Sequence, residues 1–239
     1  MTETPPILEG DGLHTHIGSS HILHGVSLRV ERGEVVCLLG RNGMGKTTTL
    51  RTLLGLLRPT HGAVRVNGRV MTGAPPKAIV RQGIAVVPEG RGVFPNLTVR
   101  ENLVMAARPG LDGRRDWTLE RVLDTFPRLA ERIGSLGDRL SGGEQQMVSI
   151  GRALMTNPDL LIMDEATEGL APLIRKEIWA VIRTVRESGI AALLVDKNVK
   201  DLLAFSDRAM VMVKGRIVMA GAAAEIARDQ DALTRHLSL

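Results

Sequence analysis

The sequence predicts an α/β fold, because short apolar strands alternate with helical segments in two parts of the chain. Residues 35–39 form an apolar run rich in β-branched side chains, which is typical of a buried parallel strand, and a glycine-rich turn and a helix-tolerant segment (48–57) follow it. A second apolar run, 158–163, precedes a predicted helix at 173–187 and a predicted strand at 190–195. Strands that alternate with helices in this way are expected to form a sheet covered by helices.

Further strands are predicted before and after this core. Residues 7–13 and 26–30 are typical of antiparallel strands, 64–66 followed by Asn67-Gly68 predicts a hairpin, and 84–87 predicts a buried strand. Residues 94–155 are mainly helical in pattern, β-rich segments flank Lys214-Gly215, and a short amphipathic tail closes the chain. We expect one domain, 1–239, with two lobes. Residues 1–92 and 157–239 would form a core and β lobe, and about 93–156 a helical lobe.

The composition indicates one sizeable aliphatic core. The chain has 239 residues, of which 44% are hydrophobic but only 2% aromatic. No apolar run reaches the ~18 residues that a membrane span requires. The single cysteine, Cys37, lies in the strand before the glycine turn, and we expect it to be an inert core residue.

The charge pattern argues against a nucleic-acid partner. The net charge is +5, from 31 basic and 26 acidic residues. Basic residues crowd one region but alternate with acidic ones, which predicts a solvated helical face. The basic residues are Arg108, Arg114, Arg115, Arg121, Arg128 and Arg132, and the acidic ones are Asp112, Asp116, Glu120, Asp124 and Glu131.

Residues 40–47 form a complete GxxxxGK[ST] phosphate loop between the strand and the helix. Its glycines permit a backbone whose N–H groups curl around a phosphate at the positive end of a helix. Lys46 would reach the β- and γ-phosphates of ATP, and the Thr47 hydroxyl would ligate Mg²⁺. The alternative is a chance glycine-rich turn with a surface lysine. The expected nucleotide-binding residues of the loop are Gly40, Asn42, Gly43, Gly45, Lys46, Thr47 and Thr48.

A pair of carboxylates ends the second apolar run, where open α/β sheets place ligand chemistry. Asp164 would hold Mg²⁺, directly or through water. Glu165 would accept a proton from the water that attacks the γ-phosphate. The alternative interpretation is that the two acids cap the helix that begins near Pro172.

A second predicted phosphate-binding turn, Ser141-Gly142-Gly143, precedes a predicted helix over 144–155. The first N–H groups of that helix lack intrahelical partners and could bind an anion. One domain does not need two phosphate cradles, so we predict a head-to-tail dimer in which Lys46 of one subunit and residues 141–143 of the other hold one ATP. Ser-Gly-Gly alone could also be a simple loop and helix cap.

These motifs resemble the nucleotide-binding subunit of ABC transporters over essentially the whole chain. The matching segments are GRNGMGKTT (40–48), LSGGEQQM (140–147) and LLIMDEAT (160–167). The resemblance implies a P-loop NTPase of the ABC ATPase type, with a RecA-like α/β core, an antiparallel β subdomain and an inserted α-helical signature subdomain. It also implies an ATPase, in which ATP closes the dimer and hydrolysis reopens it.

Two finer segments are similar to the ATP-binding subunit of branched-chain amino acid importers: VPEGR (87–91) and EGLAP (168–172). This likeness implies two membrane permease subunits, an extracytoplasmic solute-binding protein, and a peripheral position at the cytoplasmic face of the inner membrane. The subunit would pair with itself or with a sister ATPase. Urea, short amides and other amino acids remain possible cargoes, and a nucleotide-gated regulatory module with weak hydrolysis is an alternative function.

Ile17 and Glu89 depart from the wider family. Ile17 stands where an aromatic ring usually stacks on adenine, so we expect weaker base selectivity; alternatively, a shifted loop places His16 over the base. Glu89 stands where most relatives have glutamine. Its carboxylate can still ligate Mg²⁺ or orient water, but it adds negative charge beside the phosphates.

Lys197 is the third departure and stands where most relatives have a histidine that touches the γ-phosphate. It could contact the γ-phosphate or pair with Glu165 and slow hydrolysis. Alternatively, its stem points to solvent beside Asp196 or Asp201.

Residues 91–102 follow Glu89 directly, so they could sense nucleotide. We expect the permease contact here, around Phe94, Pro95 and Leu97, although Phe94 could instead anchor the helical lobe to the core.

Overall fold

The computed structural model describes residues 4–237 and divides the chain into two compact units. The first unit combines the chain up to Gln82 with the part from Ala191 onward, and the second unit is Gly83–Ile190. The outermost residues of the predicted 1–239 domain, 1–3 and 238–239, lie outside the described part. The predicted lobe boundaries near residues 93 and 156 stay a prediction.

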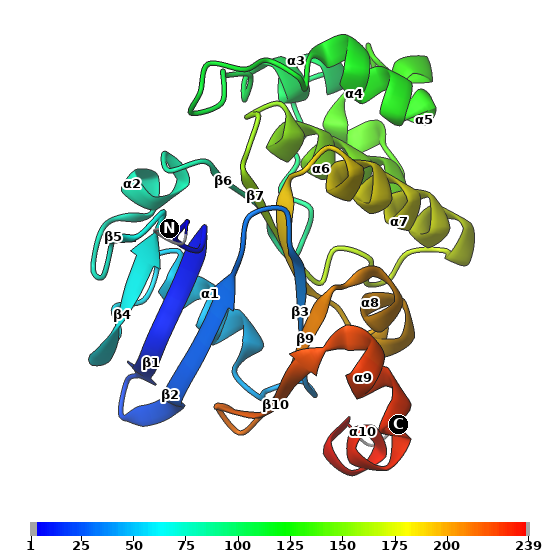
Figure 1. Ribbon diagram of the computed structural model, residues 1–239. Helices are drawn as coiled ribbons and strands as arrows, with labels where there is room; N and C mark the ends of the chain where they lie inside the picture. Colours follow the sequence, from blue (N-terminus) through cyan, green and yellow to red (C-terminus); the bar gives the residue numbers. More distant parts are fainter. Residues whose placement is uncertain (1–3, 238–239) are drawn as a thin grey trace. The chain divides into compact units, whose positions relative to one another are not determined.

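The first unit contains two sets of strands and several short helices (Figure 1). Its elements are β1 (Leu8–Ile17), β2 (Ser20–Val30), β3 (Val35–Leu39), α1 (Lys46–Leu53), β4 (His61–Val66), β5 (Arg69–Val70), α2 (Pro76–Val80), β8 (Ala191–Val195), α8 (Val199–Phe205), β9 (Arg208–Val213), β10 (Arg216–Ala222), α9 (Ala223–Arg228) and α10 (Gln230–Leu237).

An antiparallel sheet in this unit has the strand order β2-β1-β4-β5. Strand β1 pairs with both β2 and β4, and its register shifts near Leu13 and His16. The β4–β5 turn has positive φ at Asn67 (51°) and Gly68 (75°), as expected for an Asn-Gly hairpin, so this predicted hairpin is confirmed.

The other strands of the first unit have the order β10-β9-β3-β8. Strand β3 is parallel to β8 and β9, and β10 is antiparallel to β9. All five residues of β3 and all five of β8 are buried, which explains their continuous apolar sequences. Cys37 is part of this core, and burial raises the pKa of its thiol to about 11.

The second unit consists of a parallel strand pair and a set of helices. Strand β7 is entirely buried, and helix α7 buries one face that includes Ile178, Val181 and Val185. The elements are β6 (Ile84–Val87), α3 (Val99–Val104), α4 (Leu119–Thr125), α5 (Pro127–Glu131), a 3₁₀ turn (Gly137–Arg139), α6 (Gly142–Leu154), β7 (Leu160–Asp164) and α7 (Pro172–Glu187).

Two sequence-based expectations are wrong in detail. The predicted helix at 48–57 is α1, which begins at Lys46 and ends at Leu53, because Gly55 (φ 72°) turns the chain where a side chain would collide with the carbonyl of Ala74. The predicted solvated helical face is also interrupted. Arg114 lies outside any helix and forms ion pairs with Asp112, Asp116 and Asp159.

Within residues 4–237, no helix has both the length and the apolar character needed to cross a bilayer.

Candidate functional site

The predicted phosphate loop connects the buried strand β3 to helix α1 in the first unit. Gly43 (φ 77°) and Gly45 (φ 107°) have left-handed backbones, and Gly45 is the N-cap of α1. The side chain of Lys46 is almost fully buried, and its Nζ donates hydrogen bonds to the carbonyl oxygens of Gly40 (2.8 Å) and Arg41 (3.1 Å). The ammonium group is therefore held against the backbone of the loop, where a phosphate would meet it.

The β9–β10 turn supports this loop. The backbone N–H of Gly215 donates to the carbonyl of Met44 (2.9 Å), and the carbonyl of Gly215 accepts from the N–H of His24 (2.9 Å). Gly215 has φ 73°, and a side chain there would collide with the carbonyl of Ile22. The sequence predicted a β-rich segment at Lys214-Gly215 but gave no sign of this contact with the phosphate loop.

The predicted adenine contact lies at the β1–β2 turn. Ile17 ends β1, pairs with Ser20 and is 48% exposed, so its apolar face is available to a base. The alternative candidate, His16, stacks instead on His21, with ring centroids 4.2 Å apart and nearly parallel planes.

Lys197 follows strand β8 and is exposed. It belongs to the wall of a cavity of about 830 Å³ formed mainly by α8, α9 and α10. Neighbouring wall residues include Lys200 and Leu233. Its predicted contact with a γ-phosphate or with Glu165 stays a prediction.

The predicted carboxylates lie in the second unit, after strand β7. Asp164 ends β7 and is buried, whereas Glu165 is half-buried and has a left-handed backbone (φ 50°). One carboxylate oxygen from each of Glu89, Glu165 and Glu168 lies within 4.8 Å of the others. Carboxylate oxygens are ligands that Mg²⁺ takes, and of this group only Glu89 was an expected ligand; Glu165 was expected as the general base, and Glu168 was not predicted to take part.

A run of left-handed residues follows Glu89. Gly90, Arg91 and Gly92 have φ of 84°, 67° and 59°. The guanidinium of Arg91 donates to Oε1 of Gln145 (3.3 Å), and a Cβ on Gly142 would lie only 2.6 Å from it. Arg91 thus connects the segment after Glu89 with the start of α6, a role that the sequence did not reveal.

Arg152 holds the same segment from within α6. It donates to the carbonyl of Gly92 (2.7 Å), and its guanidinium carbon lies 5.2 Å from the ring centre of Phe94. Phe94 is 46% exposed, so it combines a contact within the unit with a surface that a partner could use. Both predicted roles of Phe94 stay predictions.

The second predicted phosphate-binding turn is the N-terminus of α6. Ser141 caps this helix in a capping box: its Oγ accepts from the N–H of Glu144 (3.3 Å), and the Glu144 carboxylate accepts from the N–H of Ser141 (2.7 Å). The N–H groups of Gly142 and Gly143 belong to the first turn and have no intrahelical acceptor. Gly143 is also sterically required, because a Cβ there would lie 2.6 Å from Ile174.

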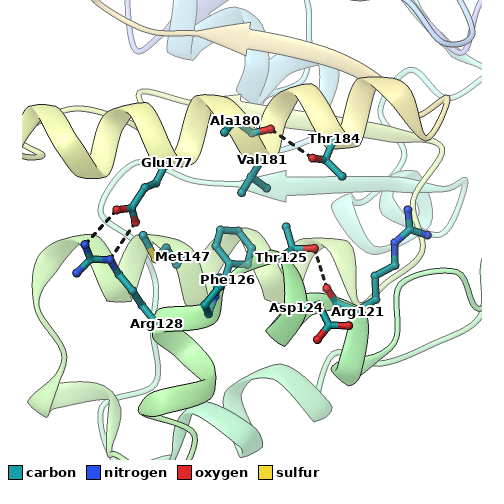
Figure 2. A pocket seen from close by; sticks show the side chains of 11 residues that line it. Arg121, Asp124, Thr125, Phe126, Arg128, Met147, Glu177, Ala180, Val181 and Thr184 are labelled. Carbon is teal, nitrogen blue, oxygen red and sulfur yellow. Dashed lines mark hydrogen bonds and ion pairs between the residues drawn. The ribbon is translucent and has the colours of Figure 1, made fainter.

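A separate cavity of about 650 Å³ lies among α4, α5, α6 and α7 (Figure 2). Phe126 and Met147 supply apolar walls, and Arg128 forms a bidentate ion pair with Glu177, with both N–O distances 3.0 Å. None of the residues predicted to bind nucleotide lines this cavity.

A glycine loop with a buried lysine at a helix N-terminus, and carboxylates at the end of a buried strand, define a nucleotide-binding protein of the P-loop NTPase class. The profile of the ABC transporter family matches residues 23–168. The chain therefore belongs to the ABC transporter family, as an ATP-binding and ATP-hydrolysing subunit of a kind that works with membrane permease components.

Individual relatives span most of the chain. It is 45% identical to the high-affinity branched-chain amino acid transport ATP-binding protein BraG of Pseudomonas aeruginosa, over 89% of this chain and 91% of the relative. It is 33% identical to the lipopolysaccharide export system ATP-binding protein LptB of Haemophilus influenzae, over 94% of each chain. The ADP conformation of MJ1267, an ATP-binding cassette of an ABC transporter, is similar in structure, with a TM-score of 0.81, 26% identity, and coverage of 96% of this chain and 98% of that chain.

Proposed function

We propose that this subunit powers an importer for branched-chain or related amino acids. The observation that carries the proposal is the 45% identity to BraG over 89% of the chain, compared with 33% to LptB. The segments 87–91 and 168–172, which resemble those of branched-chain amino acid importers, support the same assignment. A lipopolysaccharide exporter has the weaker support.

The proposed nucleotide-binding residues begin with the phosphate loop. Lys46, held by carbonyl groups of its own loop, would exchange these for β- and γ-phosphate oxygens. The Thr47 hydroxyl and the carboxylates of Glu89 and Asp164 are the proposed Mg²⁺ ligands; of these, only Glu89 belongs to the carboxylate grouping with Glu165 and Glu168. When bound, the ion would neutralise charge on the phosphates.

Glu165 is the proposed general base. Its carboxylate would take the proton of the attacking water. Glu89 and Lys197 would modulate the charge near the γ-phosphate. A glutamine at position 165 keeps the shape of the side chain but cannot accept this proton. We therefore expect Glu165→Gln to lower ATP turnover by about 10²- to 10⁴-fold while ATP binding remains.

The test is steady-state ATP turnover and nucleotide affinity in the complex assembled with its permease subunits. Glu187→Gln, at an exposed position of α7, is the matched control and should behave like the wild type. Unchanged turnover in Glu165→Gln would remove Glu165 from the reaction.

The proposed assembly is a head-to-tail dimer, with itself or with a sister ATPase, at the cytoplasmic face of the inner membrane. Residues 141–143 would complete the site of the facing subunit through the outward N–H groups of α6. An extracytoplasmic solute-binding protein would deliver the cargo. Proteoliposomes that contain all partners should show turnover stimulated by branched-chain amino acids; stimulation by urea or short amides alone would reassign the cargo.

A further inference from the structure

Five of the six histidines of the chain lie together in the antiparallel sheet of the first unit. The group consists of His14 and His16 on β1, His21 and His24 on β2, and His61 on β4. We call it the histidine cluster. The sixth histidine, His236, belongs to α10.

Strand pairing explains why these residues meet. His14 is paired with His24 on one side and with His61 on the other, and His16 is paired with His21. Residues of a strand alternate between its two faces, and Thr15, between His14 and His16, is completely buried. The histidines therefore share the opposite face, where His16, His21 and His61 are exposed and the other two are half-buried.

The rings are in direct contact. Nδ1 of His14 and Nε2 of His21 share a hydrogen bond of 3.1 Å. The ring centre of His21 is 4.2 Å from that of His16 and 4.0 Å from that of His24, while the ring centres of His14 and His61 are 5.8 Å apart. The ring of His21 therefore lies close to the rings of His14, His16 and His24.

We propose that the histidine cluster binds a divalent transition-metal ion such as Zn²⁺, Ni²⁺ or Cu²⁺. Imidazole nitrogen is a preferred ligand of these ions. Two nitrogens bound to a tetrahedral Zn²⁺ at about 2.0–2.1 Å are about 3.3 Å apart, close to the 3.1 Å between His14 and His21, so an ion could replace the proton of their hydrogen bond after a small rotation of the rings. A third ligand would come from His16, His24 or His61 by rotation of a ring at the surface.

The electrostatics of the cluster are compatible with this role. Metal ions bind the neutral imidazole, and partial burial, followed by the charges of His21, His61 and Arg216, lowers the pKa of His14. The pKa of His24 is lowered by partial burial and then by His21 and Arg216. Arg216 opposes the binding of a cation, so the site depends on several nitrogen ligands acting together.

The test is isothermal titration calorimetry of the full chain, without an added histidine tag or nucleotide, with ZnCl₂ and with NiCl₂. We expect saturable binding of Zn²⁺, and an affinity at least about ten-fold weaker in His21→Asn. The matched control, His236→Asn, should bind as the wild type does. Thermal melting of each variant without metal checks that the fold is retained, which the exposure of His21 favours.

A second measurement identifies the ligand atoms. Electron paramagnetic resonance of the chain loaded with one equivalent of Cu²⁺ should show splitting from several nitrogens in the wild type and in His236→Asn, and fewer in His21→Asn. No saturable binding by the wild type would overturn the proposal. The proposal would also fail if His21→Asn and the double variant His14→Asn/His24→Asn both bound the ion as tightly as the wild type does, because the ion would then lie elsewhere.

Discussion

Asn102 is the buried polar residue that organises the segment after Glu89. It is completely buried in α3, and its Oδ1 accepts a hydrogen bond from the N–H of Phe94 (2.9 Å). Its amide nitrogen lies 3.0–3.1 Å from the carbonyl oxygens of Phe94, Leu97 and Thr98. The amide has two hydrogens for these three acceptors, so at most three hydrogen bonds are fully formed at one time.

We predict that Asn102→Ala lowers the free energy of unfolding by about 3 kcal/mol. Each of the three hydrogen bonds that can form at one time contributes about 1 kcal/mol net. For a chain of 239 residues this corresponds to a fall in Tm of about 6–12 °C.

Differential scanning calorimetry of the nucleotide-free chain measures this change. Asn96→Ala is the matched control, since Asn96 is exposed in the same segment, and it should alter Tm by less than about 2 °C. A Tm for Asn102→Ala within 2 °C of the wild type would refute the assignment of this residue as the organiser of the segment.

Two further predictions concern the first unit. Because burial raises the pKa of Cys37 to about 11, we expect no alkylation by iodoacetamide at pH 7.5 in the native chain and complete alkylation in guanidinium; rapid native labelling would contradict this. The carboxylate of Glu34 forms two hydrogen bonds with Arg208, at 2.8 and 3.1 Å. Burial raises the pKa of Glu34, but its bonds with Arg208 and Glu31 lower it overall, below the ordinary value of 4.5. The stabilisation, on the order of 1 kcal/mol, should therefore be complete above pH 4.5 and disappear as the pH falls through the lowered value. Thermal melts of wild type and Glu34→Gln at pH 7 and pH 3 check this, and an equal difference at both values would be inconsistent with it.

The sequence predicted the local features of this fold better than the tertiary ones. Gly43 and Gly45 restrict the phosphate loop to one kind of backbone, and Asn67-Gly68 specifies its own turn, so both were predictable from neighbouring residues. The end of α1 was not predictable, because apolar residues continue to position 57 and the approach of Ala74 to Gly55 depends on the folded chain.

The same distinction applies to the candidate site. The sequence predicts a strand that is followed by the carboxylates of Asp164 and Glu165. The proximity of Glu168 to Glu89 depends on the folded conformation of the loop after β7, which no local pattern specifies. The histidine cluster was also missed. The register shifts of β1, near Leu13 and His16, determine which histidines become opposite one another, and no local pattern encodes them.

Arg91 has a strained left-handed backbone, and its side chain forms a hydrogen bond with Gln145. A left-handed conformation at a residue other than glycine costs about 1–2 kcal/mol, and Arg91 adopts it while its guanidinium contacts Gln145. Glycine at this position would relax the main chain and at the same time detach it from α6. In such a variant, the relief of backbone strain and the loss of the contact with Gln145 would therefore act on heat resistance in opposite directions.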